Sequence, residues 1–217
     1  MNEIRVLIVD DHPLFRRGVR LYLDTVEDIR VVGEAEDGDG TLSALADREI
    51  DVLLLDLQMP ERDGIDVMRE IFARGSAVRI LVLTSFGTWD RIRAALGVGA
   101  SGYVLKDADP RELEAAIRAV AAGGSYLDRR ATEELLHRVE PEAFAPGSSG
   151  REPLSGREME VLALITRGMG NREIAQTLVV SEKTIKTHVA NIMAKLGVKN
   201  RTQAALVAMR ERLVPGE

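Results

Sequence analysis

The sequence predicts an α/β domain with a five-stranded, doubly wound parallel sheet, followed by an all-α domain of four helices. Three observations lead to this prediction. Short apolar runs rich in β-branched residues alternate with segments of helical spacing through the first 122 residues. A stretch rich in Pro, Gly and Ser follows at 141–153. Beyond it, only helical spacing continues.

Five short runs in the first half have the composition of buried strands. They show little alternation of apolar and polar residues, as expected for strands covered by helices on both faces. Because crossovers between parallel strands are right-handed, the carboxyl ends of all five should lie at one edge of the sheet. The runs are RVLIV (5–9), IRVVGEA (29–35), DVLLLD (51–56), RILVLT (79–84) and GYVLK (102–106).

Helical segments separate and follow these runs. The last of them has a defined start, with Asp109 as N-cap, Pro110 at the first helical position and Glu112 at the third. After two glycines, residues 128–139 predict one further short helix. The five main segments cover about 14–25, 38–48, 64–74, 88–98 and 110–122.

The second half reads as four helices. Ser155 and Glu158 have the spacing of a capping box, and Ser181 is a natural N-cap for the third helix of the group. The predicted helices cover about 155–167, 171–178, 182–196 and 201–212.

The amino-acid composition excludes several classes of protein and of site. The chain has no cysteine, which excludes disulfides and thiolate metal sites. No stretch approaches the ~20 apolar residues of a membrane span, and the N-terminus lacks the features of a signal peptide. We therefore expect a cytoplasmic protein.

The two halves of the chain differ in charge. Residues 151–217 hold 11 Lys and Arg against 7 Asp and Glu, and residues 1–150 hold 18 Lys and Arg against 28 Asp and Glu. An acidic half and a basic half suggest different partners.

Polar residues stand at the ends of several predicted strands. Asp10 and Asp11 end the first, Asp56 the third, Thr84 the fourth and Lys106 the fifth. Ligand sites in open α/β sheets lie beyond the strand carboxyl ends, so these residues should converge. Three carboxylates together favour a hard cation such as Mg²⁺. A hydroxyl and an ammonium facing it suit a phosphoryl group.

The stretches VDDHPLFRRG, LLDLQMPERDG, LTSF and GASGYVLKD resemble the receiver domain of bacterial two-component response regulators, over about residues 3–122. The resemblance implies a flavodoxin-like fold and phosphorylation of Asp56 by a sensor histidine kinase. The residues it implies are Asp56 as phosphoacceptor; Asp10, Asp11, Asp56 and the backbone carbonyl of Gln58 for Mg²⁺, with Asp10 acting mostly through water; and Thr84, Lys106 and Tyr103 for phosphoryl binding and switching.

An aspartate after an apolar strand is also found in haloacid-dehalogenase-type phosphatases. Those enzymes need a second acid two residues later as general acid. Here that position is Gln58, which cannot donate a proton in that role. The acidic pair on the first strand also fits the phosphatase arrangement poorly. We keep this enzyme class as a weaker alternative.

Residues 154–206 resemble the LuxR-type helix-turn-helix of the NarL/FixJ family. Ile185, Val189, Ile192 and Leu196 recur at helical spacing and should pack inward. The opposite face of a longer second helix would enter the major groove of DNA. The residues implied at the DNA are Lys186, Thr187, Ala190 and Asn191 on that helix, with Lys183, Lys195, Lys199 and Arg201 as phosphate contacts.

The predicted domains are a receiver at 1–124, a linker at 125–152 with a short helix in it, and a LuxR-type helix-turn-helix domain at 153–217. The function this implies is a DNA-binding response regulator, a transcription regulator and not an enzyme beyond the phosphorylation chemistry at Asp56. Its expected cofactor is Mg²⁺. Its expected partners are a sensor histidine kinase, double-stranded promoter DNA and a second copy on phosphorylation, with RNA polymerase as a further candidate and no membrane.

Two other readings remain open. In one, the receiver serves as a protein-interaction module beside a degenerate helix-turn-helix. The intact polar face of the second helix argues against it. In the other, the protein regulates transcription without phosphorylation. The presence of Asp10, Asp11, Asp56, Thr84 and Lys106 argues against that.

Overall fold

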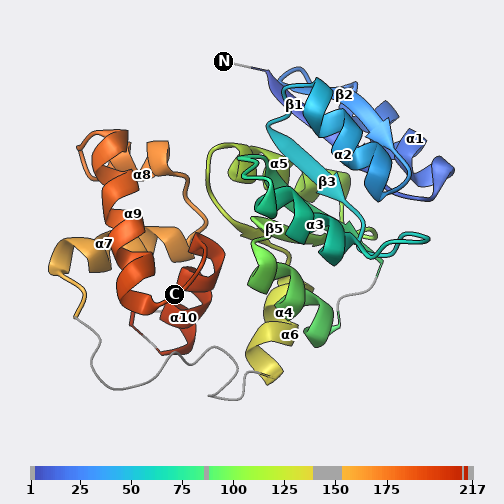
Figure 1. Cartoon of the computed structure of the whole chain (residues 1–217). Coiled ribbons are helices and arrows are strands. Elements are labelled where there is room, and N and C mark those ends of the chain that lie inside the picture. Colours follow the sequence, from blue (N-terminus) through green and yellow to red (C-terminus); the bar gives the residue numbers. More distant parts are fainter. Residues whose placement is uncertain (1–2, 86–87, 139–152, 212, 215–217) are drawn as a thin grey trace.

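The computed structural model describes residues 3–85, 88–138, 153–211 and 213–214 (Figure 1). Over these ranges the chain forms an α/β domain and a helical domain, which confirms the predicted fold class. The α/β domain is built on one parallel sheet in the order β2-β1-β3-β4-β5-β6. Its strands are β1 (Ile4–Val9), β2 (Ile29–Ala35), β3 (Val52–Leu55), β4 (Arg79–Thr84), β5 (Gly102–Leu105) and β6 (Tyr126–Leu127).

Helices cover both faces of this sheet. One core cluster joins the sheet to α1 and α5, and the other joins it to α2, α3, α4 and α6. Strands β3, β4 and β5 are buried almost throughout, which explains why their sequences show little alternation. The helices are α1 (Pro13–Leu23), α2 (Gly38–Asp47), α3 (Gly64–Ala73), α4 (Trp89–Val98), α5 (Pro110–Ala121) and α6 (Arg129–Arg138).

Residues 125–138 differ from the sequence expectation. The sequence predicts a linker here, but β6 pairs with Gly102 and Tyr103 of β5 as a sixth strand, and α6 packs against β5 and α4. Asp128 joins the two elements. Its carboxylate accepts hydrogen bonds from the Leu105 amide and the Ala131 amide, both at 2.7 Å. This segment therefore belongs to the α/β domain, whereas the rest of the predicted linker, 139–152, lies outside the described residues.

The helical domain consists of α7 (Gly156–Thr166), α8 (Asn171–Thr177), α9 (Glu182–Leu196) and α10 (Arg201–Arg210). The capping box of Ser155 and Glu158 is present at the start of α7. At the start of α9, the Ser181 hydroxyl accepts a hydrogen bond from the Thr184 amide at 3.1 Å. Both predicted helix starts are confirmed, because side-chain oxygens satisfy amides that have no partner within the helix.

The start of α10 holds the helical domain against the α/β domain. The Leu96 carbonyl, in the last turn of α4, accepts hydrogen bonds from Asn200 Nδ2 at 2.8 Å and from Gln203 Nε2 at 3.0 Å. Thr202 Oγ1 lies 3.0 Å from Ser125 Oγ. In Figure 1, α10 accordingly lies between α9 and α4.

Arg201 is at the centre of this contact. Its guanidinium donates to the Gly123 carbonyl of the α/β domain, and to the Met169 carbonyl at 2.6 Å and Asn171 Oδ1 at 3.1 Å within the helical domain. Burial lowers the pKa of Arg201 to about 10. At Gly124 an added Cβ would lie 2.7 Å from the Gly168 carbonyl oxygen, so the two backbones touch directly.

No helix among the described residues is both long enough and apolar enough to cross a membrane.

Candidate functional site

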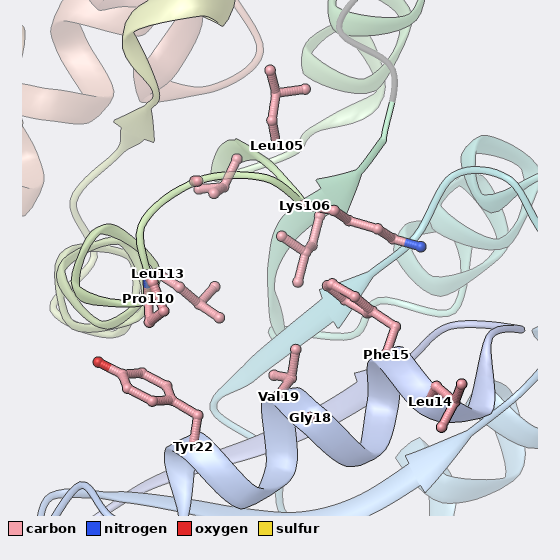
Figure 2. A pocket seen from close by; sticks show the side chains of 12 residues that line it. Leu14, Phe15, Gly18, Val19, Tyr22, Leu105, Lys106, Pro110 and Leu113 are labelled. Carbon is pink, nitrogen blue, oxygen red and sulfur yellow. The ribbon is translucent and has the colours of Figure 1, made fainter.

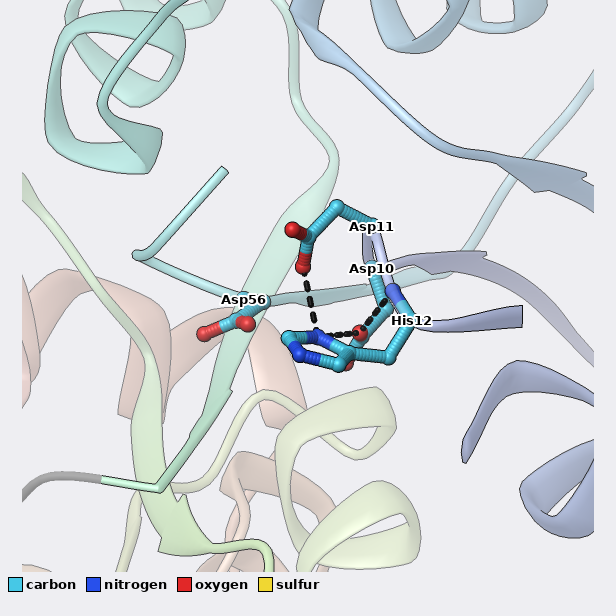
Figure 3. A group of neighbouring side chains, drawn as sticks. All are labelled: Asp10, Asp11, His12 and Asp56. Carbon is cyan, nitrogen blue, oxygen red and sulfur yellow. Dashed lines mark hydrogen bonds and ion pairs between the residues drawn. The ribbon is translucent and has the colours of Figure 1, made fainter. Parts of the chain in front are cut away.

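The carboxylates at the strand ends lie together at one edge of the sheet (Figure 3). Asp10 and Asp56 are almost fully buried, with exposed fractions of 2% and 3%. Donor atoms of Asp10, Asp11, His12 and Asp56 all lie within 4.8 Å of one another. The convergence follows from parallel neighbours, since β1 pairs directly with β3.

Lys106 lies against two of these carboxylates. Its ammonium is 2.5 Å from Asp10 Oδ2 and 2.7 Å from Asp56 Oδ2. Burial lowers the pKa of Lys106, but its hydrogen bonds to Asp10 and Asp56 outweigh burial, so the pKa lies above its usual value. The ammonium also sits 4.7 Å from the centre of the Phe15 ring. Lys106 thus partly neutralises buried charge that would otherwise be costly.

Thr84 completes the set predicted at the strand ends, and Tyr103 is the switch residue implied by the receiver resemblance. Thr84 is fully buried, and its hydroxyl oxygen has no hydrogen-bond partner among the described residues. A buried hydroxyl in that state is unusual and points to a missing ligand. The Tyr103 side chain on β5 is fully buried, and burial raises its pKa above the usual value. The ring therefore occupies an inward position.

These residues fit a divalent cation. Carboxylate oxygens are the ligands that Mg²⁺ prefers, and Asp11 is partly open to solvent, which suits an ion that keeps several waters. The Gln58 amide donates to Asp56 Oδ1 at 3.2 Å, so the loop after β3 is held against the phosphoacceptor candidate. The Gln58 side chain is exposed, so only its backbone lies against the carboxylate.

His12 is a site residue that sequence reasoning missed. Its Nδ1 atom lies 2.7 Å from Asp11 Oδ1 and 3.3 Å from Asp10 Oδ1 (Figure 3). The signal in the sequence is its position directly after the acidic pair and before Pro13, which starts α1. A residue there is carried to the sheet edge by the same strand that carries the two acids.

A mostly apolar pocket of about 260 Å³ lies beside the site, between α1 and α5 (Figure 2). Phe15 and Tyr22 line it from α1, Leu113 lines it from α5, and the stem of Lys106 closes the end nearest the carboxylates. Leu14 at its rim is 88% exposed. The pocket and the acidic site therefore share one side chain.

Helix α9 has one buried and one exposed face. Ile185, Val189, Ile192 and Leu196 are buried as predicted. The residues expected to approach DNA, Lys183, Lys186, Thr187, Ala190 and Asn191, are all exposed. The α/β domain touches the other side of the helical domain, through α10 and the loop before α8, so it leaves this face open.

Besides Lys183, the other three expected phosphate contacts are placed differently from one another. Lys199 is exposed. Lys195 is half-buried and lies 2.9 Å from Glu158, whose pKa is held below its usual range by the Ser155 amide and by this lysine. Arg201 makes the contacts between the domains described above. In this arrangement Lys195 and Arg201 have partners inside the protein.

Two protein families match this chain in separate segments. The family described as "Response regulator receiver domain" matches residues 6–118. The family described as "Bacterial regulatory proteins, luxR family" matches residues 152–208. The first segment contains the acidic site and the second contains α9 with its exposed polar face.

Relatives match over nearly the whole chain. "Transcriptional regulatory protein LiaR" of Bacillus subtilis is 39% identical over 211 residues, covering 97% of this chain and 99% of its own. "Nitrate/nitrite response regulator protein NarP" of Escherichia coli is 38% identical and covers 97% of each chain. Both are regulators, not enzymes, so the phosphatase alternative is wrong.

Among solved structures, one titled "Structure of the two-component response regulator RcsB-DNA complex" is similar to this chain. The identity is 32% and the TM-score 0.60, with 96% of this chain and 98% of the other covered. The similarity extends through both domains.

Proposed function

The chain belongs to the response regulators of bacterial two-component systems that carry a LuxR-type DNA-binding domain, and from this premise we propose that a histidine kinase phosphorylates Asp56 to control promoter binding. The observation that carries the proposal is the pairing of Asp56 with Lys106 beside a buried Thr84 hydroxyl, for which the described part of the chain offers no hydrogen-bond partner. Action on promoter DNA implies a cytoplasmic location.

Phosphoryl transfer requires an in-line approach to Asp56. One Asp56 oxygen forms a bond to phosphorus while the bond between phosphorus and the kinase histidine nitrogen breaks. An aspartate carboxylate is a weak nucleophile, so placement and charge neutralisation must supply most of the rate. The end of a buried strand supplies the placement, because Asp56 follows directly after β3.

Lys106 and Thr84 stabilise the charge that arrives. Lys106 exchanges part of its contact with the Asp56 carboxylate for the phosphoryl oxygens, and Thr84 donates its free hydroxyl to another. Asp11, Asp56 and the Gln58 carbonyl, with Asp10 in support, would hold Mg²⁺, which would offset repulsion between the carboxylates and the phosphoryl group. The partner of the Thr84 hydroxyl is then the phosphoryl group itself.

We propose that the contact between the two domains changes when Asp56 is phosphorylated. Leu96, in the last turn of α4, belongs to the same core cluster as Tyr103 of β5, and β5 leads to Lys106. A shift of Thr84 and Tyr103 would move α4 and the Leu96 carbonyl, which holds Asn200 and Gln203 of the DNA-binding domain. Release would free the start of α10, including Arg201, for other partners.

The second copy would dock on α1 and α5. The support is the apolar pocket between these helices, together with Leu14 and Leu21, whose side chains are 88% and 63% exposed. Leu14 lines the pocket and Leu21 lies on the same helix, and exposed apolar side chains that gather on one surface are typical of protein interfaces. Because Lys106 borders both the pocket and Asp56, phosphorylation and pairing would favour each other.

The proposed function is tested by comparing phosphorylated and unphosphorylated full-length protein. DNA sites are first selected from genomic fragments with protein treated with acetyl phosphate and Mg²⁺, and are then trimmed to one or two half-sites. We expect phosphorylation to raise affinity for the paired site by at least about tenfold, through dimer formation. Sedimentation should show the dimer. If neither sedimentation nor affinity for the paired site responds to phosphorylation, the proposal is wrong.

The direct contribution of α9 is tested with Lys186→Ala. Lys186 is exposed and makes a 3.0 Å ion pair with Glu182 one turn away, which contributes little to stability. We expect specific DNA binding to weaken by about 1–3 kcal/mol if Lys186 contacts a base edge, with reduced discrimination. A phosphate contact would instead weaken specific and non-specific binding alike and lower the salt dependence.

The matched control is Arg129→Ala, which removes one positive charge from α6, away from α9. Its binding should stay near that of the wild type at two salt concentrations. Equal binding by Lys186→Ala and this control would remove Lys186 from the DNA interface.

A further inference from the structure

His12 adds a nitrogen donor to a site whose other side chains offer only oxygen. We propose that the His12 imidazole binds the divalent cation directly and gives the site a preference for Mn²⁺ and later first-row ions over Mg²⁺. This inference rests on the metal site of the proposed function and concerns which ion that site selects.

The backbone of His12 is fixed at the site. Its amide donates to Asp10 Oδ1 at 2.9 Å, and its carbonyl accepts from the Arg16 amide at 3.1 Å in the first turn of α1. His12 is the N-cap residue of α1, but its side chain makes no capping hydrogen bond. The ring is therefore held near the carboxylates without a role in starting the helix.

The distances around His12 match those between ligands of one ion. Neighbouring ligands of an octahedral ion lie ~3 Å apart when each is ~2.1 Å from the metal. His12 Nδ1 lies 2.7 Å from Asp11 Oδ1 and 3.3 Å from Asp10 Oδ1, on either side of that value. Figure 3 shows the ring beside the carboxylates of Asp10 and Asp11, with Asp56 next to it.

His12 approaches the site from its solvent-exposed side. Lys106 binds Oδ2 of both Asp10 and Asp56. These two acids are nearly buried, whereas the His12 side chain is 68% exposed. An ion between Asp11 and Asp56 would otherwise meet solvent there. The imidazole would replace one water of that ion.

Replacing a water by imidazole changes ion preference. Mg²⁺ is a hard cation that binds oxygen and retains its waters, so a nitrogen donor adds little to its affinity. Imidazole suits Mn²⁺, Co²⁺ and Zn²⁺ increasingly well, following the general order of stability of divalent complexes. If His12 only formed an ion pair with Asp11 and did not bind the metal, it would not change which ion the site prefers.

The test is a titration of the unphosphorylated full-length protein with Mn²⁺, followed by the electron paramagnetic resonance signal of the free ion. Mg²⁺ affinity is obtained by competition. We expect His12→Ala to weaken Mn²⁺ binding by about tenfold or more, and Mg²⁺ binding by no more than about twofold. The control is His188→Ala on α9, which should change neither affinity.

Proton NMR of the imidazole rings gives a second readout. The chain has three histidines, and variants at His12 and His188 assign their signals. A substoichiometric amount of Mn²⁺ should broaden the His12 signal first and leave that of His188 sharp. Equal Mn²⁺ affinity in wild type and His12→Ala would overturn the role of His12 and leave the metal site standing. Absence of Mn²⁺ binding by the wild type would overturn the metal site as well.

Discussion

Replacing Asp56 with asparagine should abolish the phosphoryl adduct formed with acetyl phosphate and Mg²⁺, while the fold is retained. Asp56 is the carboxylate at the end of β3, and the amide of asparagine has no oxygen able to form a stable acyl phosphate. The side chains are nearly equal in volume, so packing at this buried position is preserved. Lys106 keeps its partner Asp10. Intact-mass spectrometry measures the adduct, and circular dichroism checks the fold.

The matched control is Asp66→Asn, which removes an exposed carboxylate on α3 that pairs with Arg69 one turn away. It should be phosphorylated like the wild type. An undiminished adduct on Asp56→Asn would show that another residue accepts the phosphoryl group and would refute the assigned role of Asp56.

Gly64→Ala should destabilise the receiver domain by at least about 3 kcal/mol, because the new methyl group would overlap backbone that cannot rotate away. A Cβ at Gly64 would lie 2.4 Å from the Asp56 carbonyl oxygen and 2.8 Å from the Leu57 Cα atom. The overlap would push the start of α3 from the end of β3. Phosphorylation should slow as well, because Asp56 is displaced from Lys106.

Urea denaturation measures the stability effect, and the rate of adduct formation measures the effect on the site. Gly97→Ala is the control. An added Cβ there meets nothing within 4 Å, and the position lies inside α4. Alanine at such a site should leave stability unchanged or raise it by up to about 1 kcal/mol. If the two substitutions have equal effects, the contact between Gly64 and β3 is not tight in solution.

The acidic site could be predicted from sequence because its geometry follows from topology. Once β1, β3, β4 and β5 are recognised as parallel and buried, the residues after them must meet at one edge. Asp10, Asp56 and Lys106 do meet there. The helix starts at Asp109, Ser155 and Ser181 could also be predicted from sequence, because a capping side chain binds amides only two or three residues away.

Three features escaped prediction for physical reasons. Strand β6 has two residues, too few for any period to be seen, and its place depends on pairing with Gly102 and Tyr103. In the sequence, His12 looks like an ordinary polar residue before a helix. Its position beside the carboxylates becomes visible only in the folded structure, where the neighbouring strand brings Asp56 to the same edge. The roles of Asn200 and Arg201 depend on acceptors about 80 to 100 positions earlier in the chain, which no local pattern reveals.

The two sides of the interdomain contact are chemically unequal. The DNA-binding domain offers side chains of Asn200, Arg201 and Gln203, whereas the receiver mainly offers backbone carbonyls, those of Leu96 and Gly123. A carbonyl is present whatever side chain its residue carries. Selection can therefore change the receiver sequence at these positions, for example to suit a new kinase, without losing the contact. In the first turn of α10, by contrast, the contact depends on the side chains themselves. Substitutions that uncouple the two domains should therefore be found mainly there.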